Sequence, residues 1–143
     1  MTRHAGQYPP DVAELRRARV ETSERAAQLG AVPEVCDAVA LIVDELFNNA
    51  IEHGHGYRRS RAALVFAVAL RGDRLHLEFE DPEMPEGQVR DLAQALGEAA
   101  NGMPALDSER GRGLFLISIY MEELRVAVAP GGGLQLQGRL AKP

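Results

Sequence analysis

The sequence is poor in cysteine and in aromatic residues, and it has no tryptophan among its 143 residues. Its single cysteine, Cys36, excludes an internal disulfide, and its apolar neighbours predict a buried, inert thiol in a reducing compartment. No stretch approaches the ~18 apolar residues of a membrane span, and residues 1–10 lack the apolar core of a signal peptide. We therefore expect a cytoplasmic protein that does not bind membranes.

Positive charge is also in short supply. The chain has 16 Lys and Arg against 21 Asp and Glu, which gives a net charge of −5 and a pI of about 5.4. Such a chain has no global positive field to attract nucleic acid, so nucleic acid is not an expected partner. Hydrophobic residues make up 45 % and charged residues 26 %, which is typical of a folded domain, and the length fits one domain over residues 1–143.

Apolar residues at three- and four-residue spacing predict two helices in the first part of the chain. The first covers residues 11–29, opens with a capping-box pattern at Asp11 and Glu14, and ends at Gly30. The second begins near Pro33, which suits a first helical position, and runs to the glycines at 54 and 56.

Alternating apolar residues predict two β-hairpins, one over residues 64–79 and one over residues 124–140. A helix over residues 114–121 precedes the second hairpin. Residues 82–110, with Pro and Gly at both ends, predict a long mobile segment with only a weak helix, and residues 1–8 predict at best a poor strand.

This order of elements predicts the α+β class, as a two-layer α/β sandwich with helices on one face of a mixed, mainly antiparallel sheet. The other face of the sheet is expected to be solvated or used for association.

Three polar residues of the second helix, Glu45, Asn49 and His53, recur every four residues and form one column at the border of the apolar stripe. A carboxylate there can accept a proton from a nucleophile, and an amide oxygen one turn further can help to coordinate Mg²⁺. The alternative is a solvated Glu45, a helix-bending Asn49 and a histidine at a helix end. A zinc site at His53 and His55 is rejected, because no Cys or carboxylate completes a ligand set.

Asp81 ends a predicted strand, where its carboxylate can accept a hydrogen bond from an exocyclic amine, although many strands end in Asp for turn reasons alone. Further on, Gly111 and Gly113 would let the backbone approach phosphate at a helix N-terminus, and Arg110 or Arg112 would add positive charge. A plain flexible hinge would show the same glycines.

Arg19 lies in the apolar stripe of the first helix, and no acidic residue stands one helical turn away. This position indicates a contact with a partner protein, and the alternative is a half-buried arginine whose charged end reaches water.

Three segments, in this order and spacing, resemble the N, G1 and G2 boxes of GHKL ATPases. They are LIVDELFNNAIEHGHG at 41–56, FEDPEMP at 79–85 and ERGRGLFLISIYMEEL at 109–124. Within that superfamily the resemblance is strongest to the bacterial anti-sigma-factor serine/threonine kinases, and it covers residues 11–140. It implies the Bergerat ATP-binding fold.

The resemblance also implies roles for individual residues. Glu45 would be the general base, Asn49 the Mg²⁺ ligand and Asp81 the adenine-binding carboxylate, while Arg19 matches an arginine used against protein partners. The remaining implied nucleotide-binding residues are His53 of the N box and the phosphate-loop residues Arg110, Gly111, Arg112 and Gly113, which would close a lid over residues 86–110.

The implied activity is Mg²⁺- and ATP-dependent phosphorylation of a serine or threonine on an anti-anti-sigma protein with a STAS domain. A sigma factor is the second implied partner, and a homodimer the implied assembly. Glu83 stands where the family has the first glycine of the G1 box, which predicts weakened ATP binding. The alternative is therefore a non-catalytic module of the same fold that acts by binding proteins. A histidine-kinase catalytic domain is less favoured, because this sequence shows no dimerisation helix with a phosphoacceptor His.

Overall fold

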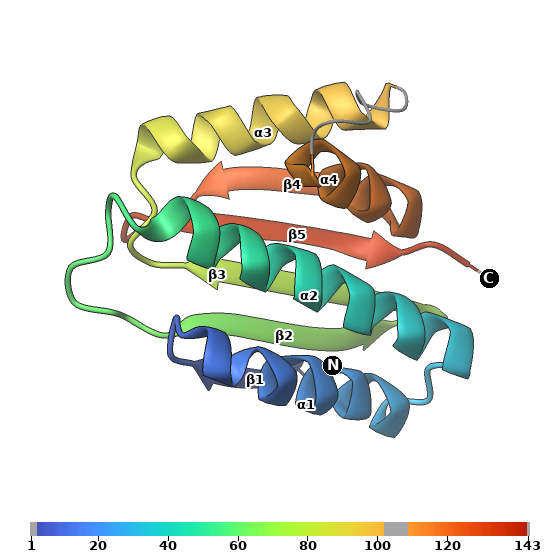
Figure 1. Ribbon diagram of the computed structural model, residues 1–143. Helices are drawn as coiled ribbons and strands as arrows, with labels where there is room; N and C mark the ends of the chain where they lie inside the picture. Colours follow the sequence, from blue (N-terminus) through green and yellow to red (C-terminus); the bar gives the residue numbers. More distant parts are fainter. Residues whose placement is uncertain (1–2, 102–108, 143) are drawn as a thin grey trace.

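The computed structural model describes residues 3–101 and 109–142 (Figure 1). Its elements are, in chain order, β1 (Arg3–Tyr8), the 3-10 turn η1 (Val12–Glu14), α1 (Leu15–Gln28), α2 (Pro33–Gly54), β2 (Leu64–Arg71), β3 (Arg74–Asp81), α3 (Glu86–Ala100), α4 (Glu109–Tyr120), β4 (Met121–Val128) and β5 (Leu134–Leu140). No helix within this part of the chain combines the length and the apolar character needed to cross a membrane.

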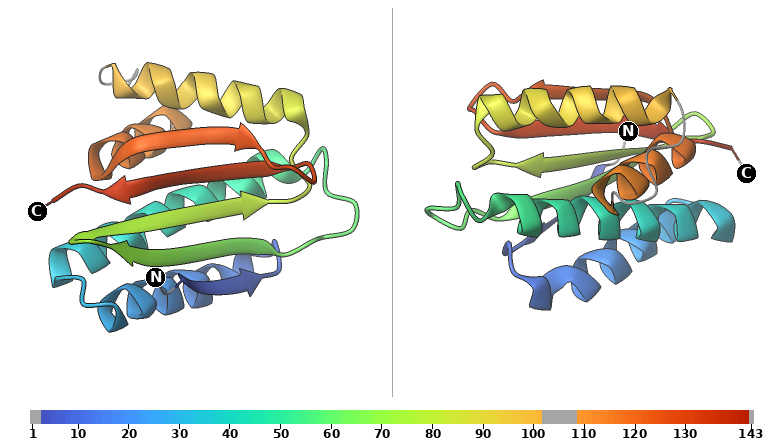
Figure 2. Two further views of the ribbon diagram at one scale, coloured as in Figure 1. Left: turned by 180° about the vertical axis from the view of Figure 1, so that it is seen from behind. Right: turned by 45° about the horizontal axis from the view of Figure 1, so that its top comes forward.

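The strands form one five-stranded sheet in the order β1-β2-β3-β5-β4, and all four neighbouring pairs are antiparallel. Helices α1, α2 and α4 lie over one face, and the view from behind shows the strands in front of them (Figure 2). The predicted α+β class and the two-layer arrangement are confirmed, and so are both predicted hairpins.

The core lies between α2 and the centre of the sheet. The strand register places Phe66 opposite Phe79, and Phe79 opposite Leu136, so one apolar row crosses three strands beneath the helices. Phe47 of α2 stacks on Phe66 with ring centroids 6.2 Å apart, and Phe66 contacts Phe79 at 4.8 Å. All four side chains are almost completely buried, which holds α2 in a fixed position over the sheet.

The two predicted helices at the start of the chain form, and α1 ends at Gly30, where a φ of +98° favours glycine. The predicted capping box is wrong in detail. Asp11 accepts a hydrogen bond from the Ala13 backbone at 2.9 Å, whereas Glu14 pairs with Arg17 at 2.6 Å and does not reach back to Asp11. The first helical segment therefore begins with a short 3-10 turn, η1, before α1.

Residues 3–8 form a full strand, so the prediction of a poor one was wrong. Strand β1 pairs along its whole length with β2 through the backbone, which needs no apolar alternation. Buried Tyr8 anchors its end, because the Tyr8 hydroxyl donates to Glu21 at 2.9 Å and accepts from Arg25 at 2.6 Å. A Cβ atom at Gly6 would lie 2.5 Å from the Tyr8 hydroxyl, so glycine is needed beside this anchor.

The segment expected to be mobile contains a regular 15-residue helix, α3. It buries Val89, Leu92, Leu96 and Ala99 and packs against α4 and β4, so the prediction of a weak helix with few anchors was wrong for residues 86–100. Residues 102–108 of the expected lid lie outside the described part of the chain.

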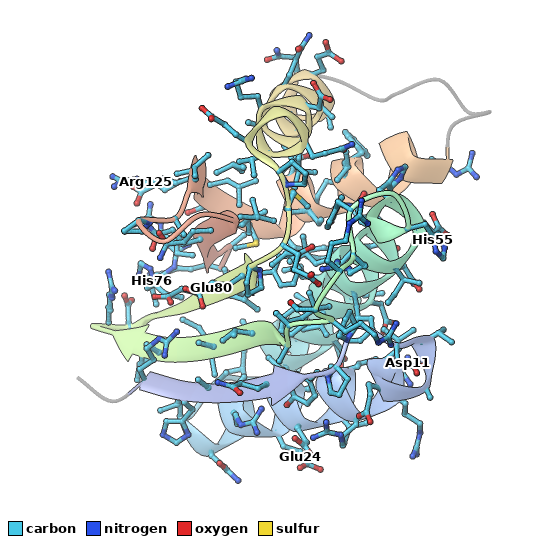
Figure 3. All side chains as sticks on the ribbon, turned by 90° about the vertical axis from the view of Figure 1, so that its left-hand side faces the viewer. Asp11, Glu24, His55, His76, Glu80 and Arg125 are labelled. Atoms are coloured by element: carbon cyan, nitrogen blue, oxygen red, sulfur yellow. The ribbon has the colours of Figure 1, made fainter. Side chains whose placement is uncertain are left out.

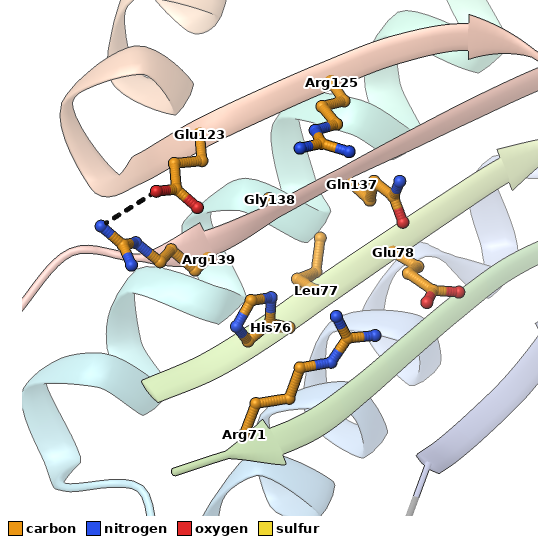
Figure 4. A pocket seen from close by; sticks show the side chains of 9 residues that line it. All are labelled: Arg71, His76, Leu77, Glu78, Glu123, Arg125, Gln137, Gly138 and Arg139. Carbon is orange, nitrogen blue, oxygen red and sulfur yellow. Dashed lines mark ion pairs between the residues drawn. The ribbon is translucent and has the colours of Figure 1, made fainter. Parts of the chain in front are cut away.

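The face of the sheet that points away from α2 carries charged and polar side chains. Viewed along the sheet, His76, Glu80 and Arg125 project from this face, while His55 lies on the helical side (Figure 3). A hollow on this face contains the ion pair between Glu123 and Arg139 at 3.3 Å (Figure 4). The polar composition agrees with the expectation that this face is solvated or used for association.

Candidate functional site

The polar column of α2 lies where the sequence placed it, at the border between the buried face of the helix and solvent. Asn49 is buried at 8 % exposure and Glu45 is half-buried. Burial raises the pKa of Glu45, and the nearby carboxylates of Asp44 and Glu52 raise it further. A carboxyl group with a raised pKa accepts a proton more readily, which suits the predicted general base.

The first turns of α4 approach this column directly. A Cβ atom built at Gly113 would overlap Glu45 Oε2, so a larger residue there would force the Glu45 carboxylate to move from its present position. The structure therefore brings together a G2-box glycine and the N-box carboxylate, which are far apart in the sequence.

The glycine segment is helical rather than a loop before the helix, because α4 begins at Glu109. Arg110 and Gly111 belong to its first turn, and the side chain of Arg110 lies outside the described part of the structure. Arg112 is exposed. The backbone N–H groups at the start of this helix are the groups that bind anions most readily in proteins.

Asp81 ends β3, as predicted, and its side chain is completely buried. Both carboxylate oxygens are already bonded within the chain. Arg58 donates to Oδ1 and to Oδ2, each at 2.6 Å, and the Tyr57 hydroxyl donates to Oδ2 at 2.8 Å. The carboxylate that the resemblance assigns to adenine thus holds an arginine of its own chain in this structure.

Arg58 reaches Asp81 from the segment that follows α2. Its guanidinium also donates to the backbone carbonyl of Ala50 at 3.1 Å and lies 4.8 Å from the centre of the Tyr57 ring. Only 11 % of the Arg58 side chain is exposed. Burial and the neighbouring Asp81 raise the pKa of Tyr57, so this hydroxyl stays protonated and acts as a donor.

Glu83 stands in the position of the family's first G1 glycine, and it holds the same segment. Its Oε1 accepts from the backbone N–H groups of Arg59 at 2.8 Å and Ser60 at 2.7 Å, and from the Ser60 hydroxyl at 3.1 Å. Its Oε2 lies 3.7 Å from the Arg58 guanidinium. Burial opposes ionisation of Glu83, but these donors outweigh it and lower its pKa to about 2.

A further glycine, Gly133, lies in the turn between β4 and β5. Its φ is +88°, and a Cβ atom there would lie 2.7 Å from the carbonyl oxygen of Asp81 and from Pro82 Cα. Glycine thus lets the β4–β5 turn close over the end of β3 and support Asp81 from behind. The three consecutive glycines at 131–133 were a visible sign of a tight turn, but its neighbour in space depends on the sheet order.

Arg19 is neutralised within the chain by an acidic residue of another helix. One guanidinium nitrogen lies 3.2 Å from both carboxylate oxygens of Asp44 on α2. The prediction considered only acidic residues on the same helix, whereas the neighbouring helix supplies the partner. The Arg19 side chain is still 36 % exposed, so a contact with another protein remains a prediction.

His53 is half-buried on the polar column of α2, and His55 is exposed. Among residues 3–101 and 109–142, no group of three His, Cys, Asp or Glu side chains could hold a metal ion. The residues around the column fit the resemblance at Glu45, Asn49 and Gly113. They do not fit adenine at Asp81 while Arg58 occupies both of its oxygens.

Helices on one face of an open antiparallel sheet, with an N-box column facing a glycine-containing helix start, define an ATPase-like domain of the GHKL type. The chain matches the histidine kinase-like ATPase domain over residues 8–137, and it belongs to that family. The search among curated proteins found no match.

Two solved structures share the fold. One is the SiaB-SiaC complex from Pseudomonas aeruginosa, with a TM-score of 0.73 and 16 % identity over 96 % of this chain and 88 % of that chain. The other holds the RsbU and RsbW domains of Rv1364c from Mycobacterium tuberculosis, with a TM-score of 0.63 and 18 % identity over 100 % of this chain and 34 % of that chain. At these identities the likeness shows the fold alone.

Proposed function

We propose that this domain is an anti-sigma factor of a partner-switching system and an ATP-dependent serine/threonine protein kinase that phosphorylates a STAS-type anti-anti-sigma protein. Family membership and the resemblance of the three boxes support the proposal. The observation that carries it is Glu45, a half-buried carboxylate of raised pKa that faces the start of α4. The two solved structures of similar fold agree with it. One is a complex of two proteins, and the other joins an RsbU and an RsbW domain in one chain.

In this proposal Glu45 would accept the proton of the substrate hydroxyl as that oxygen bonds to the γ-phosphorus of ATP and ADP leaves. Asn49 would hold Mg²⁺, and the backbone amides at the start of α4 would bind phosphate oxygens. When bound, ATP would supply the phosphoryl group and Mg²⁺ would neutralise part of the phosphate charge. We further propose a homodimer in the cytoplasm, a sigma factor as the second protein partner, and neither nucleic acid nor membrane among its ligands.

The test is calorimetric titration with ATP and Mg²⁺, followed by transfer of labelled phosphate to candidate STAS-domain proteins. Glu45→Ala should leave ATP binding nearly intact and lower transfer by ~10²- to 10⁴-fold, whereas Asn49→Ala should weaken Mg²⁺-dependent binding. Asp37→Ala, which removes an exposed carboxylate from the same helix, is the matched control and should behave as the wild type. Wild-type transfer by both site variants would refute the kinase assignment.

A second candidate function is a module of this fold that regulates by binding proteins without catalysis. The specific observation in its favour is the ion pair that occupies Asp81. The same titration separates the two candidates, because a folded domain that releases no heat with ATP and Mg²⁺ but binds its protein partner would support the second.

A further inference from the structure

At the buried end of β3, the Arg58 guanidinium binds the Asp81 carboxylate in the way that a ligand with N–H donors would bind it. Asp81 is completely buried, and Arg58 presents two N–H groups to its two oxygens at equal distances of 2.6 Å. An amino-bearing base would use the same carboxylate as its acceptor. An arginine makes the stronger contact, because it is charged and binds both oxygens at once.

We propose that Arg58 is an internal competitor for the nucleotide base, so that ATP binds only when the Arg58 guanidinium leaves Asp81. This inference rests on the proposed nucleotide-binding function. It assigns to Arg58 the role of setting how tightly, and under which conditions, the domain takes its nucleotide.

The chain is shaped to hold Arg58 in this place. A Cβ atom at Gly54 would lie 2.8 Å from Arg58 Nε, so glycine leaves the space through which the side chain folds back along α2. The carbonyl oxygen of Ala50 accepts a further N–H group of the guanidinium at 3.1 Å. The Arg58 guanidinium therefore donates to Asp81 and to Ala50 in the interior of the protein, and this is not a surface contact.

Glu83 also helps to hold Arg58 in this position. Its Oε1 accepts hydrogen bonds from the backbone N–H groups of the two residues that follow Arg58, which are Arg59 and Ser60. Its Oε2 lies 3.7 Å from the Arg58 guanidinium. Glu83, at the position of the G1 glycine, thus contacts both the backbone next to Arg58 and the guanidinium that occupies Asp81. A glycine at position 83 would remove the acceptor for the Arg59 and Ser60 backbone N–H groups.

Competition of this kind has a measurable consequence. If the site is free of Arg58 in less than about a tenth of the molecules, the apparent dissociation constant is raised at least about tenfold over that of an open site. Removing Arg58 should restore the tighter binding. The effect should depend on the base, because Asp81 reads the base and the phosphates are bound elsewhere.

The experiment compares calorimetric dissociation constants for ATP with Mg²⁺ and for inorganic tripolyphosphate with Mg²⁺. Arg58→Gln keeps much of the side-chain volume and removes the charge. We expect it to bind ATP at least about tenfold more tightly than the wild type, with little change for tripolyphosphate. Arg59→Gln is the control and should match the wild type, since the Arg59 side chain is exposed and donates to the backbone carbonyl of Arg58 rather than to Asp81.

Glu83→Gly gives a second route to the same result if Arg58→Gln folds poorly, because it keeps the Arg58 side chain but removes the contacts of Glu83 with Arg59, Ser60 and the guanidinium, so that Arg58 leaves Asp81 more readily. It should also tighten ATP binding. Equal or weaker ATP binding by these folded variants, in a background where the wild type binds ATP, would overturn the inference and leave the proposed function standing. An equal gain for tripolyphosphate would also overturn it. Absence of ATP binding by wild type and variants alike would refute both.

Discussion

Glu83 allows a quantitative test of how the segment after α2 is held, independent of any nucleotide. Its pKa falls from an ordinary 4.5 to about 2, a difference that corresponds to roughly 3 kcal/mol of stability. The bonds to Arg59 and Ser60 lie at the protein surface, where water replaces part of what is lost. We therefore expect Glu83→Ala to lower the free energy of unfolding by about 1–2 kcal/mol at pH 7.

The stability that Glu83 contributes should also depend on pH in a defined direction. A carboxyl group whose pKa is lowered by folding stabilises the protein fully above its unfolded pKa, here 4.5, and loses that effect as the pH falls toward 2. The difference between wild type and Glu83→Ala in urea unfolding should therefore be largest at pH 7 and shrink at pH 4 and pH 3. Glu24→Ala, which removes an exposed carboxylate from α1, controls for the change in net charge. A difference that is absent at pH 7, or that stays constant down to pH 3, would refute the reasoning.

Three further predictions concern packing and the partner surface. Gly113→Ala places a methyl group against the Glu45 carboxylate, which can turn aside, so it should change the free energy of unfolding by no more than about 1 kcal/mol, and a larger loss would show that Glu45 is fixed in its present position. Leu96→Ala removes a buried anchor of α3 and should cost about 2–5 kcal/mol in urea unfolding, whereas a loss under 1 kcal/mol would indicate that α3 is loosely docked. Arg19→Ala should weaken binding to a protein partner by on the order of 2 kcal/mol while its half-exposed ion pair costs less than ~1 kcal/mol of stability, and equal partner affinities for Arg19→Ala and Arg16→Ala would refute a partner role.

Local rules were sufficient for much of the fold. Helical spacing of apolar residues, with Pro33 at a helix start and Gly30 at a helix end, located α1 and α2, and alternation located both hairpins. The same rules missed β1, because its stability comes from backbone pairing with β2 and from the Tyr8 anchor. They undervalued α3, because the apolar stripe of that helix is stabilised by α4 and β4, which follow it in the chain.

The candidate site divides in the same way. The position of Glu45 and Asn49 on one side of α2 follows from their spacing, and the place of Asp81 at the end of β3 follows from the length of the apolar run. Arg58 follows the glycines of the N box and stands among several arginines, at 58, 59 and 61, and nothing local distinguishes the one that is buried.

The sequence by itself determined α1, α2 and both hairpins, the faces that these elements bury, and the family that the site residues resemble. Only the tertiary structure decided which charges from different elements meet. Arg58 reaches Asp81 across 23 positions and Arg19 reaches Asp44 across 25. The physical reason is that periodicity depends on neighbours a few residues apart, whereas a long arginine side chain takes its partner from whichever element the packed core places beside it.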